Sequence, residues 1–178
     1  YGLGACSSPV QAGTLGVHTI LEEKLGTFTG LPDRGVSLFS SGYGVNTGTI
    51  SAVLKRGHHI VVDQSAHMSI VEGAQLSRAK IHFFEHNNPD SLEAVLKEIG
   101  PDAERVLVCS EGVFSADGDF GALDKIVPLA KSYGAQVLVD EAHSFLLCGP
   151  HGRGVAAMQG VLDQVDYFVV TFSKAMGG

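Results

Sequence analysis

The sequence predicts an α/β fold in which a mainly parallel sheet lies between helices. Two observations lead to this prediction: helical segments alternate with short strands along the chain, and several of these strands are continuous apolar runs. Ile60-Val61-Val62 and Val137-Leu138-Val139 are such runs, which are typical of strands buried on both faces of a parallel sheet. Right-handed crossovers would bring the carboxyl ends of the strands to one edge, where ligands of such sheets bind.

The first half of the chain supplies most of the alternating segments. Apolar residues between Leu15 and Phe28 recur at helical spacing, which predicts a helix. The short apolar run Val36–Phe39 predicts a strand, which Ser40-Ser41-Gly42 ends before a second helix over Tyr43–Leu54. The unit of strand and helix then repeats over His59–Val62, His67–Leu76, Ile81–Phe84 and Ser91–Ile99.

The second half continues the pattern with a strand, a helix and two further strands. These are Arg105–Cys109, Leu123–Tyr133, Gln136–Val139 and Tyr167–Val170. A length of 178 residues without an internal repeat or a linker predicts one domain over residues 1–178. Because the chain begins at Tyr1 and stops directly after a motif described below, we expect it to be part of a longer protein.

Composition excludes several classes of protein. Hydrophobic residues make up 44% of the chain and charged residues 17%, against about 25% in an ordinary domain, which excludes intrinsic disorder. The net charge of −7 and the scattered basic residues disfavour a nucleic-acid partner or an anionic membrane surface. We expect no membrane segment. The three distant cysteines predict free thiols in a reducing compartment, and we expect a cytoplasmic location.

Polar residues gather where the predicted strands end. They are Ser41, Gly42, Tyr43, Asp63, His67, Glu111, Ser115, Asp140, His143, Thr171, Ser173 and Lys174. Taken singly, each has an ordinary explanation. The segment 41–43 is a helix cap, an anion site in which backbone N–H groups bind a phosphate, or both. Asp140 is either a turn residue or the partner of a cationic ring nitrogen.

The histidines and Lys174 also allow more than one interpretation. His67 and His143 are either hydrogen-bonded structural residues or catalytic groups, and the six other histidines are interpreted as surface or capping residues. A zinc site at His143, Cys148 and His151 is rejected because a fourth ligand and a recognised spacing are missing. Lys174 comes shortly after a predicted buried strand, where a lysine must find a partner or lose its charge, and an uncharged lysine can form a Schiff base.

Together these residues match the requirements of pyridoxal 5′-phosphate (PLP). This cofactor needs a lysine, an acid that keeps its ring nitrogen protonated, a phosphate cradle and a group stacked on its ring. No metal is expected.

Four ordered motifs resemble those of the α-oxoamine synthases, which are PLP-dependent transferases of fold type I. They are EGVFSADGD (111–119), VDEAHS (139–144), GRG (152–154) and TFSKAMGG (171–178). The resemblance implies that Lys174 binds PLP covalently, that Asp140 pairs with the ring nitrogen and that His67 stacks on the ring. It also implies that His143 and Ser115 bind the phenolic oxygen, and that Gly42, Tyr43 and Thr171 contact the phosphate.

The resemblance further implies an acyltransferase that joins an amino acid to an acyl thioester by decarboxylative condensation, giving an aminoketone. The expected partners are the amino acid, an acyl-CoA or an acyl carrier protein, and a second copy of the chain in a homodimer. Two segments depart from the family pattern, residues 6–12 and 145–148. They make a condensing domain of a polyketide-type, saxitoxin-like pathway an alternative.

Other classes of enzyme fit the sequence less well. A PLP aminotransferase would share Lys174 and Asp140, but the motifs at 111–119 and 139–144 favour condensation. The sequence lacks the glycine-rich motifs of nucleotide enzymes and the Gly-x-Ser-x-Gly motif of serine hydrolases. A non-catalytic subunit would be expected to lack the lysine at position 174.

Overall fold

The computed structural model describes residues 4–31 and 35–177. The chain divides into two compact units, Tyr1–Phe39 and Ser40–Gly178. The first unit contains a π-helical turn, Pro9–Gly13, and helix α1, Gly16–Thr29. His18 accepts a hydrogen bond from the backbone N–H of Leu15 at 3.0 Å and so caps α1, which agrees with its interpretation as a capping residue.

The predicted strand over Val36–Phe39 is wrong. This segment has no regular secondary structure and pairs with no strand among the described residues. Leu38 and Phe39 are 36% and 47% exposed, so neither is a core residue here. A short run with three apolar residues in four is compatible with a strand, but it carries no information about whether a neighbouring strand is available to pair with it.

The second unit contains a five-stranded sheet in the order β2-β1-β3-β4-β5, and every pair of neighbours is parallel. The strands lie close to their predicted positions. Their bounds are β1 His59–Asp63, β2 Lys80–Phe84, β3 Val106–Glu111, β4 Gln136–Asp140 and β5 Tyr167–Val169. The prediction of a parallel α/β sheet is therefore confirmed.

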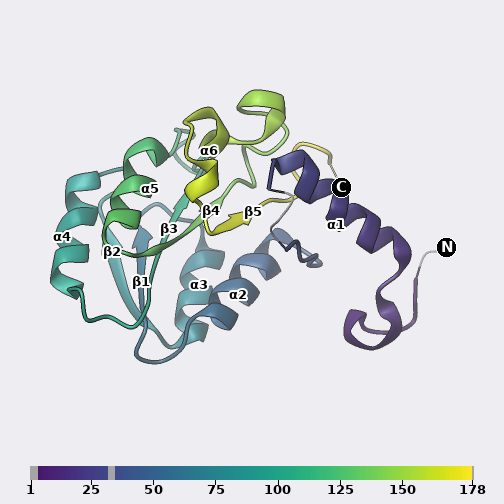
Figure 1. The fold of residues 1–178 in the computed structure, drawn as a ribbon, viewed down its shortest axis with the longest axis horizontal. Helices are drawn as coiled ribbons and strands as arrows, with labels where there is room; N and C mark the ends of the chain where they lie inside the picture. The colour runs from purple at the N-terminus through teal and green to yellow at the C-terminus, as the bar shows by residue number, and fades with distance from the viewer. Residues whose placement is uncertain (1–3, 32–34, 178) are drawn as a thin grey trace. The chain divides into compact units, whose positions relative to one another are not determined.

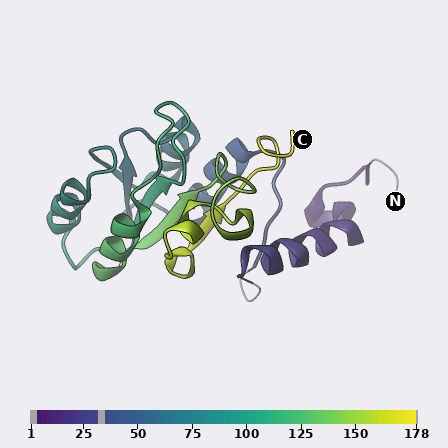
Figure 2. The same ribbon diagram turned by 90° about the horizontal axis from the view of Figure 1, so that it is seen from above.

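Helices cover both faces of this sheet (Figures 1 and 2). Helices α2, Gly42–Val53, and α3, Met68–Ser77, pack with one another and share a hydrophobic cluster with one face. Helices α4, Pro89–Ile99, α5, Leu123–Ser132, and α6, Val155–Met158, contribute to the cluster on the other face. The short helix α6 and the 3₁₀ turns Pro150–Gly152 and Leu162–Gln164 were not predicted.

The central strands direct their side chains alternately into the two clusters. In β4, Val137 and Val139 belong to one cluster and Leu138 to the other, and all three are fully buried. This burial on both faces explains why the strand is a continuous apolar run. The strand order reverses between β1 and β3, and ligands of open α/β sheets bind beside such a reversal, at the carboxyl ends of the strands.

Two further expectations can be compared with the structure. Cys6, Cys109 and Cys148 are free thiols, as predicted. Among the described residues, no helix is both long and apolar enough to cross a membrane.

Candidate active site

The beginning of α2 lies against the chain that follows β5. Ser41 is the N-cap of α2, because its Oγ accepts a hydrogen bond from the backbone N–H of Gly44 at 3.0 Å. A Cβ added to Gly42 would lie 3.4 Å from the Cβ of Thr171, so any larger side chain would fill the space between them. The hydroxyl of Thr171 lies 2.8 Å from that of Ser173. Free N–H groups at a helix start, beside these hydroxyls, form a cradle that suits a phosphate.

Tyr43 lies beside this cradle and faces the next helix. It is 43% exposed, and its ring meets that of His67 edge to face with the centroids 6.1 Å apart. A hydrogen bond with Glu72 of α3 raises the pKa of Tyr43. The contact of Tyr43 with a phosphate stays a prediction.

Asp140 is a buried acid at the end of β4. Its Oδ2 accepts a hydrogen bond from Nδ2 of Asn46 at 2.6 Å, and its Oδ1 accepts one from the backbone N–H of Ala142 at 2.9 Å. Burial raises the pKa of Asp140, while these two hydrogen bonds and the charges of His67 and His143 oppose the shift. A cation placed against this carboxylate would offset the cost of burying its charge, so the site suits a protonated ring nitrogen.

A chain of hydrogen bonds connects Asp140 to His67. Nδ2 of Asn46 also lies 2.9 Å from Oγ of Ser69, which lies 2.7 Å from Nδ1 of His67. The backbone N–H of Ser69 donates to the same Nδ1 at 3.2 Å, so Nδ1 is an acceptor and the ring hydrogen is on Nε2. Oδ1 of Asn46 is buried and has no partner among the described residues. This chain of hydrogen bonds therefore couples the orientation of the His67 ring to Asp140.

The carboxyl of Glu111 holds the main chain of His67 in place through a hydrogen bond. This carboxyl, at the end of β3, is 3% exposed and accepts a hydrogen bond from the backbone N–H of His67. Burial raises the pKa of Glu111 to about 8, the hydrogen bond from His67 opposes the shift, and the charges of Asp140 and Asp63 add to it. Both the backbone and the ring of His67 are thus held in place.

His143 and Lys174 lie at the same edge of the sheet. Burial lowers the pKa of His143, the charge of Lys174 lowers it further, and the charge of Asp140 opposes the shift. Lys174 and Asp140 therefore lie within electrostatic range of His143. Lys174 itself is exposed and lies in the turn that follows β5, whose last residue is Val169. The expectation that Lys174 must find a partner or lose its charge assumed burial, so it does not hold for this exposed residue, and its role as the PLP lysine stays a prediction.

Ser115 lies on the turn that follows β3. The turn closes through hydrogen bonds from the backbone N–H of Phe114 to the oxygen of Asp119 at 3.1 Å, and from that of Gly118 to the oxygen of Phe114 at 2.8 Å. Phe114 is fully buried and anchors the turn, whereas Ser115 is exposed. Ser115 is therefore accessible to a ligand, and its bond to the phenolic oxygen of PLP stays a prediction.

Sequence reasoning missed the residues that support this edge, namely Asn46, Ser69 and, as a support of His67, Glu111. One signal could have identified Asn46. It lies three residues after Tyr43 and four before Ile50, on the buried face of α2, where an amide needs a polar partner.

Glu141 is a further buried acid, and its role is structural. Its carboxylate accepts hydrogen bonds from the backbone N–H groups of Val155 and Ala156, at 2.9 and 2.7 Å, and from the hydroxyl of Ser144. It thereby connects the turn after β4 to the beginning of α6. A Cβ on Gly112 would lie 2.0 Å from Oε2 of Glu141 and 2.7 Å from Oγ of Ser144, so glycine is required there.

We expect Gly112→Ala to lower the free energy of unfolding by about 2 to 3 kcal/mol, because the added methyl group must displace a fully buried, hydrogen-bonded carboxylate. Urea denaturation of the full-length protein measures this change. Gly16→Ala is the control, since a Cβ there meets nothing within 4 Å, and its stability should be unchanged or slightly higher. Equal stability of both variants would contradict the close approach of Gly112 to Glu141.

The geometry of this edge can be compared with known proteins. Residues 4–178 match the model of the family described as aminotransferase class I and II. The chain belongs to this family. A relative in the family, the 8-amino-7-oxononanoate synthase of Citrifermentans bemidjiense, is 41% identical over 177 residues, which are 99% of this chain and 45% of the relative. The serine palmitoyltransferase of Sphingomonas paucimobilis is also 41% identical, over 99% of this chain and 41% of its own length.

Solved structures of serine palmitoyltransferases have the same fold as this chain. Sphingomonas wittichii serine palmitoyltransferase has a TM-score of 0.93 and 40% identity, over 98% of this chain and 43% of its own. A structure of the S. paucimobilis enzyme with bound PLP and myriocin has the same TM-score and coverage. Both named relatives are α-oxoamine synthases, so the resemblance and fold type I are confirmed. The chain spans less than half the length of the relatives it matches.

Proposed function

We propose that residues 1–178 form the large, PLP-binding domain of an acyltransferase. In this proposal the enzyme condenses an amino acid with an acyl thioester, releases the thiol and carbon dioxide, and leaves an aminoketone. The observation that carries the proposal is the buried carboxylate of Asp140 at the same sheet edge as His143 and Lys174. The named relatives, both acyl-condensing enzymes, support the type of reaction.

The residues at this edge fit PLP in three respects. Gly42 and Thr171 border a space that a single Cβ would fill, beside free N–H groups of α2, and this space suits the phosphate. Asp140 supplies a buried anion for the ring nitrogen. Lys174 is exposed and supplies a primary amine. A family relative binds PLP in a structure of the same fold, which supports this assignment.

When bound, PLP supplies an electron sink for the negative charge that forms at Cα of the amino acid. Asp140 holds the proton on the ring nitrogen and so keeps the sink effective. Lys174 would hold the cofactor through Nζ, and its free amine would accept the proton from Cα of the amino acid. His143 and Ser115 donate hydrogen bonds to the phenolic oxygen. His67, fixed by Ser69 and Glu111, contacts the ring.

The remaining partners belong to this proposal. The acyl donor is a thioester of coenzyme A or of an acyl carrier protein, and the functional unit is a homodimer in the cytoplasm. A donor carried by a protein would fit the natural-product alternative suggested by residues 6–12 and 145–148. An aminotransferase remains the competing activity, because it would use the same lysine and acid.

A substrate assay on the full-length protein with PLP distinguishes these activities. We expect a matched pair of amino acid and acyl thioester to release thiol and carbon dioxide in equal amounts. Thiol release is measured with a chromogenic disulfide, and carbon dioxide with a carboxyl-labelled amino acid. The same acyl group is offered on coenzyme A and on a carrier protein, and the faster reaction identifies the donor. Exchange between amino and keto acids without thiol release would overturn the proposal in favour of an aminotransferase.

A further inference from the structure

His86 connects two carboxylates that come from separate segments of the chain. Its Nδ1 lies 2.8 Å from Oδ1 of Asp63, at the end of β1, and its Nε2 lies 3.0 Å from Oδ2 of Asp119, in the turn that carries Ser115. An ionised carboxylate can only accept hydrogen bonds, so both ring nitrogens must donate and the ring is charged. We call this arrangement the His86 bridge. Sequence reasoning treated His86 as a surface or capping residue, which the structure corrects.

The bridge holds a turn with buried contacts of its own. The His86 ring meets Phe114 edge to face with the centroids 4.4 Å apart, and Phe114 directly precedes Ser115. The next residue, Asn87, donates from Nδ2 to Oδ2 of Asp119 at 2.9 Å and to the backbone oxygen of Phe120 at 3.0 Å. Residues 86 and 87 therefore hold the turn through an apolar contact with Phe114 and through polar contacts with Asp119 and Phe120.

The charge on His86 also stabilises the buried carboxylate of Asp63 at the end of β1. The carboxylate of Asp63 is fully buried, and besides His86 its hydrogen-bond donors among the described residues are the backbone N–H groups of Ser65 and Asn87. A buried carboxylate of this kind is costly without a cation beside it. His86 supplies that cation, so loss of its proton would weaken the bridge at both ends.

We propose that His86 is a positioning residue that, in its charged form, holds the turn 113–120 against the sheet and so presents Ser115 to the cofactor. This inference rests on the proposed function, because it takes the role of Ser115 from there. It makes PLP binding dependent on pH through a residue that does not touch the cofactor.

The sign of the pH dependence follows from the groups around His86. Burial lowers the pKa of His86, but the hydrogen bonds and charges of Asp63 and Asp119 raise it overall above its ordinary 6.5. Asp117 also lies near the ring, whereas burial, by raising the pKa of Glu111 to about 8, keeps that carboxyl largely uncharged in this pH range. Because the folded value is the higher one, the bridge is complete below about pH 6.5 and is lost as the pH rises through the folded value. Since both ring nitrogens are occupied, we assign no cation to His86, Asp117 and Asp119.

A titration of the histidine ring hydrogens by NMR tests the bridge without PLP. We expect the His86 signal of the full-length protein to titrate above the ordinary value, and Asp119→Asn to lower its midpoint. The signal is assigned by its loss in His86→Gln. A midpoint at or below 6.5 in the unaltered protein would overturn the His86 bridge and leave the proposed function untouched.

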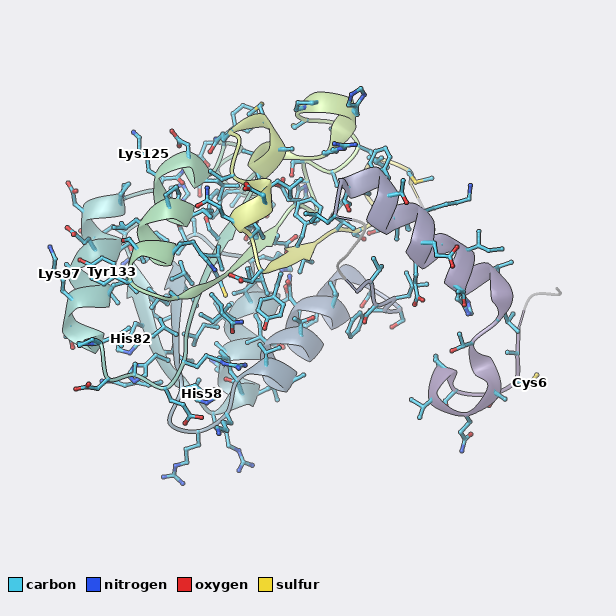
Figure 3. All side chains as sticks on the ribbon, in the orientation of Figure 1. Cys6, His58, His82, Lys97, Lys125 and Tyr133 are labelled. Carbon is cyan, nitrogen blue, oxygen red and sulfur yellow. The ribbon has the colours of Figure 1, made fainter. Side chains whose placement is uncertain are left out.

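Cofactor affinity tests the consequence. We expect the dissociation constant of PLP to rise about tenfold as the pH crosses the His86 midpoint, and Asp119→Asn to show the weaker binding at all pH values. Asp119→Asn leaves the buried pair of Asp63 and His86 intact, so it separates turn positioning from stability. The control is His82→Gln in β2 (Figure 3), whose ring stacks on that of His59 at 5.2 Å, and it should keep the unaltered affinity and pH step.

The outcomes of this test are distinct. If the PLP dissociation constant of Asp119→Asn changes with pH as much as that of the unaltered protein, the bridge has no role in cofactor binding. Failure of the unaltered protein to bind PLP at any pH would overturn the proposed function, whereas the NMR titration would still decide whether the bridge exists.

Discussion

Replacing Lys174 with alanine is expected to lower the rate of condensation by about 10⁴-fold. Nζ of Lys174 has two roles in the proposed reaction: it binds the cofactor covalently, and it takes the proton from Cα of the amino acid. Alanine removes both roles, yet it leaves the phosphate cradle at Gly42 and Thr171 in place. Thiol release measures the rate, and intact-protein mass after borohydride reduction and denaturation measures covalently retained PLP.

The control for this change is Lys125→Ala. Lys125 is an exposed lysine on α5, which covers the face of the sheet opposite to α2 and α3 (Figure 3). It should keep both the rate and the retained PLP. Lys174→Arg adds a second comparison, since it keeps the positive charge that acts on His143 but lacks an amine that can bind PLP. Full activity or covalent PLP in Lys174→Ala would overturn the assignment of the lysine.

The parallel sheet could be predicted because buried strands have a distinctive pattern. Val137-Leu138-Val139 is apolar throughout, since its residues pack alternately into both hydrophobic clusters. Val36–Phe39 has a similar composition but pairs with no strand among the described residues. Local composition reports what a segment can bury, whereas pairing depends on a neighbour supplied by another part of the chain.

The acid and the lysine of the site could be predicted for a related reason. In a parallel sheet the chain leaves the carboxyl ends of the strands at one edge, so Asp140, the last residue of β4, and Lys174, five residues after the end of β5, are both expected at that edge. Asn46 could not be assigned in the same way. Its partner Asp140 is 94 residues away, and only the packing of α2 against the sheet brings them to 2.6 Å. The contacts of His86 could not be predicted for the same reason, since its two carboxylate partners are 23 and 33 residues away in the sequence.

Asp140→Asn is expected to slow the removal of the Cα proton by about 10³-fold while PLP stays bound. An amide cannot keep a proton on the ring nitrogen, so the ring would lose most of its power to accept electrons. The measurement is the exchange of the Cα hydrogen of the amino acid in deuterated water, which needs no acyl donor. Asp124→Asn, at an exposed position in the first turn of α5, is the control and should exchange at the unaltered rate.

Two measurements separate this effect from a loss of structure. Asp140 is 6% exposed and its Oδ2 accepts a hydrogen bond from Asn46, so its replacement could also disturb α2. The amide oxygen of asparagine can still accept that bond, and Lys174 still binds PLP, so unchanged cofactor occupancy shows that the site is intact. Asn46→Ala removes the donor but keeps the carboxylate, so it should slow exchange less than Asp140→Asn does. If Asp140→Asn exchanges the Cα hydrogen at the unaltered rate with full PLP occupancy, Asp140 is not the group that protonates the ring.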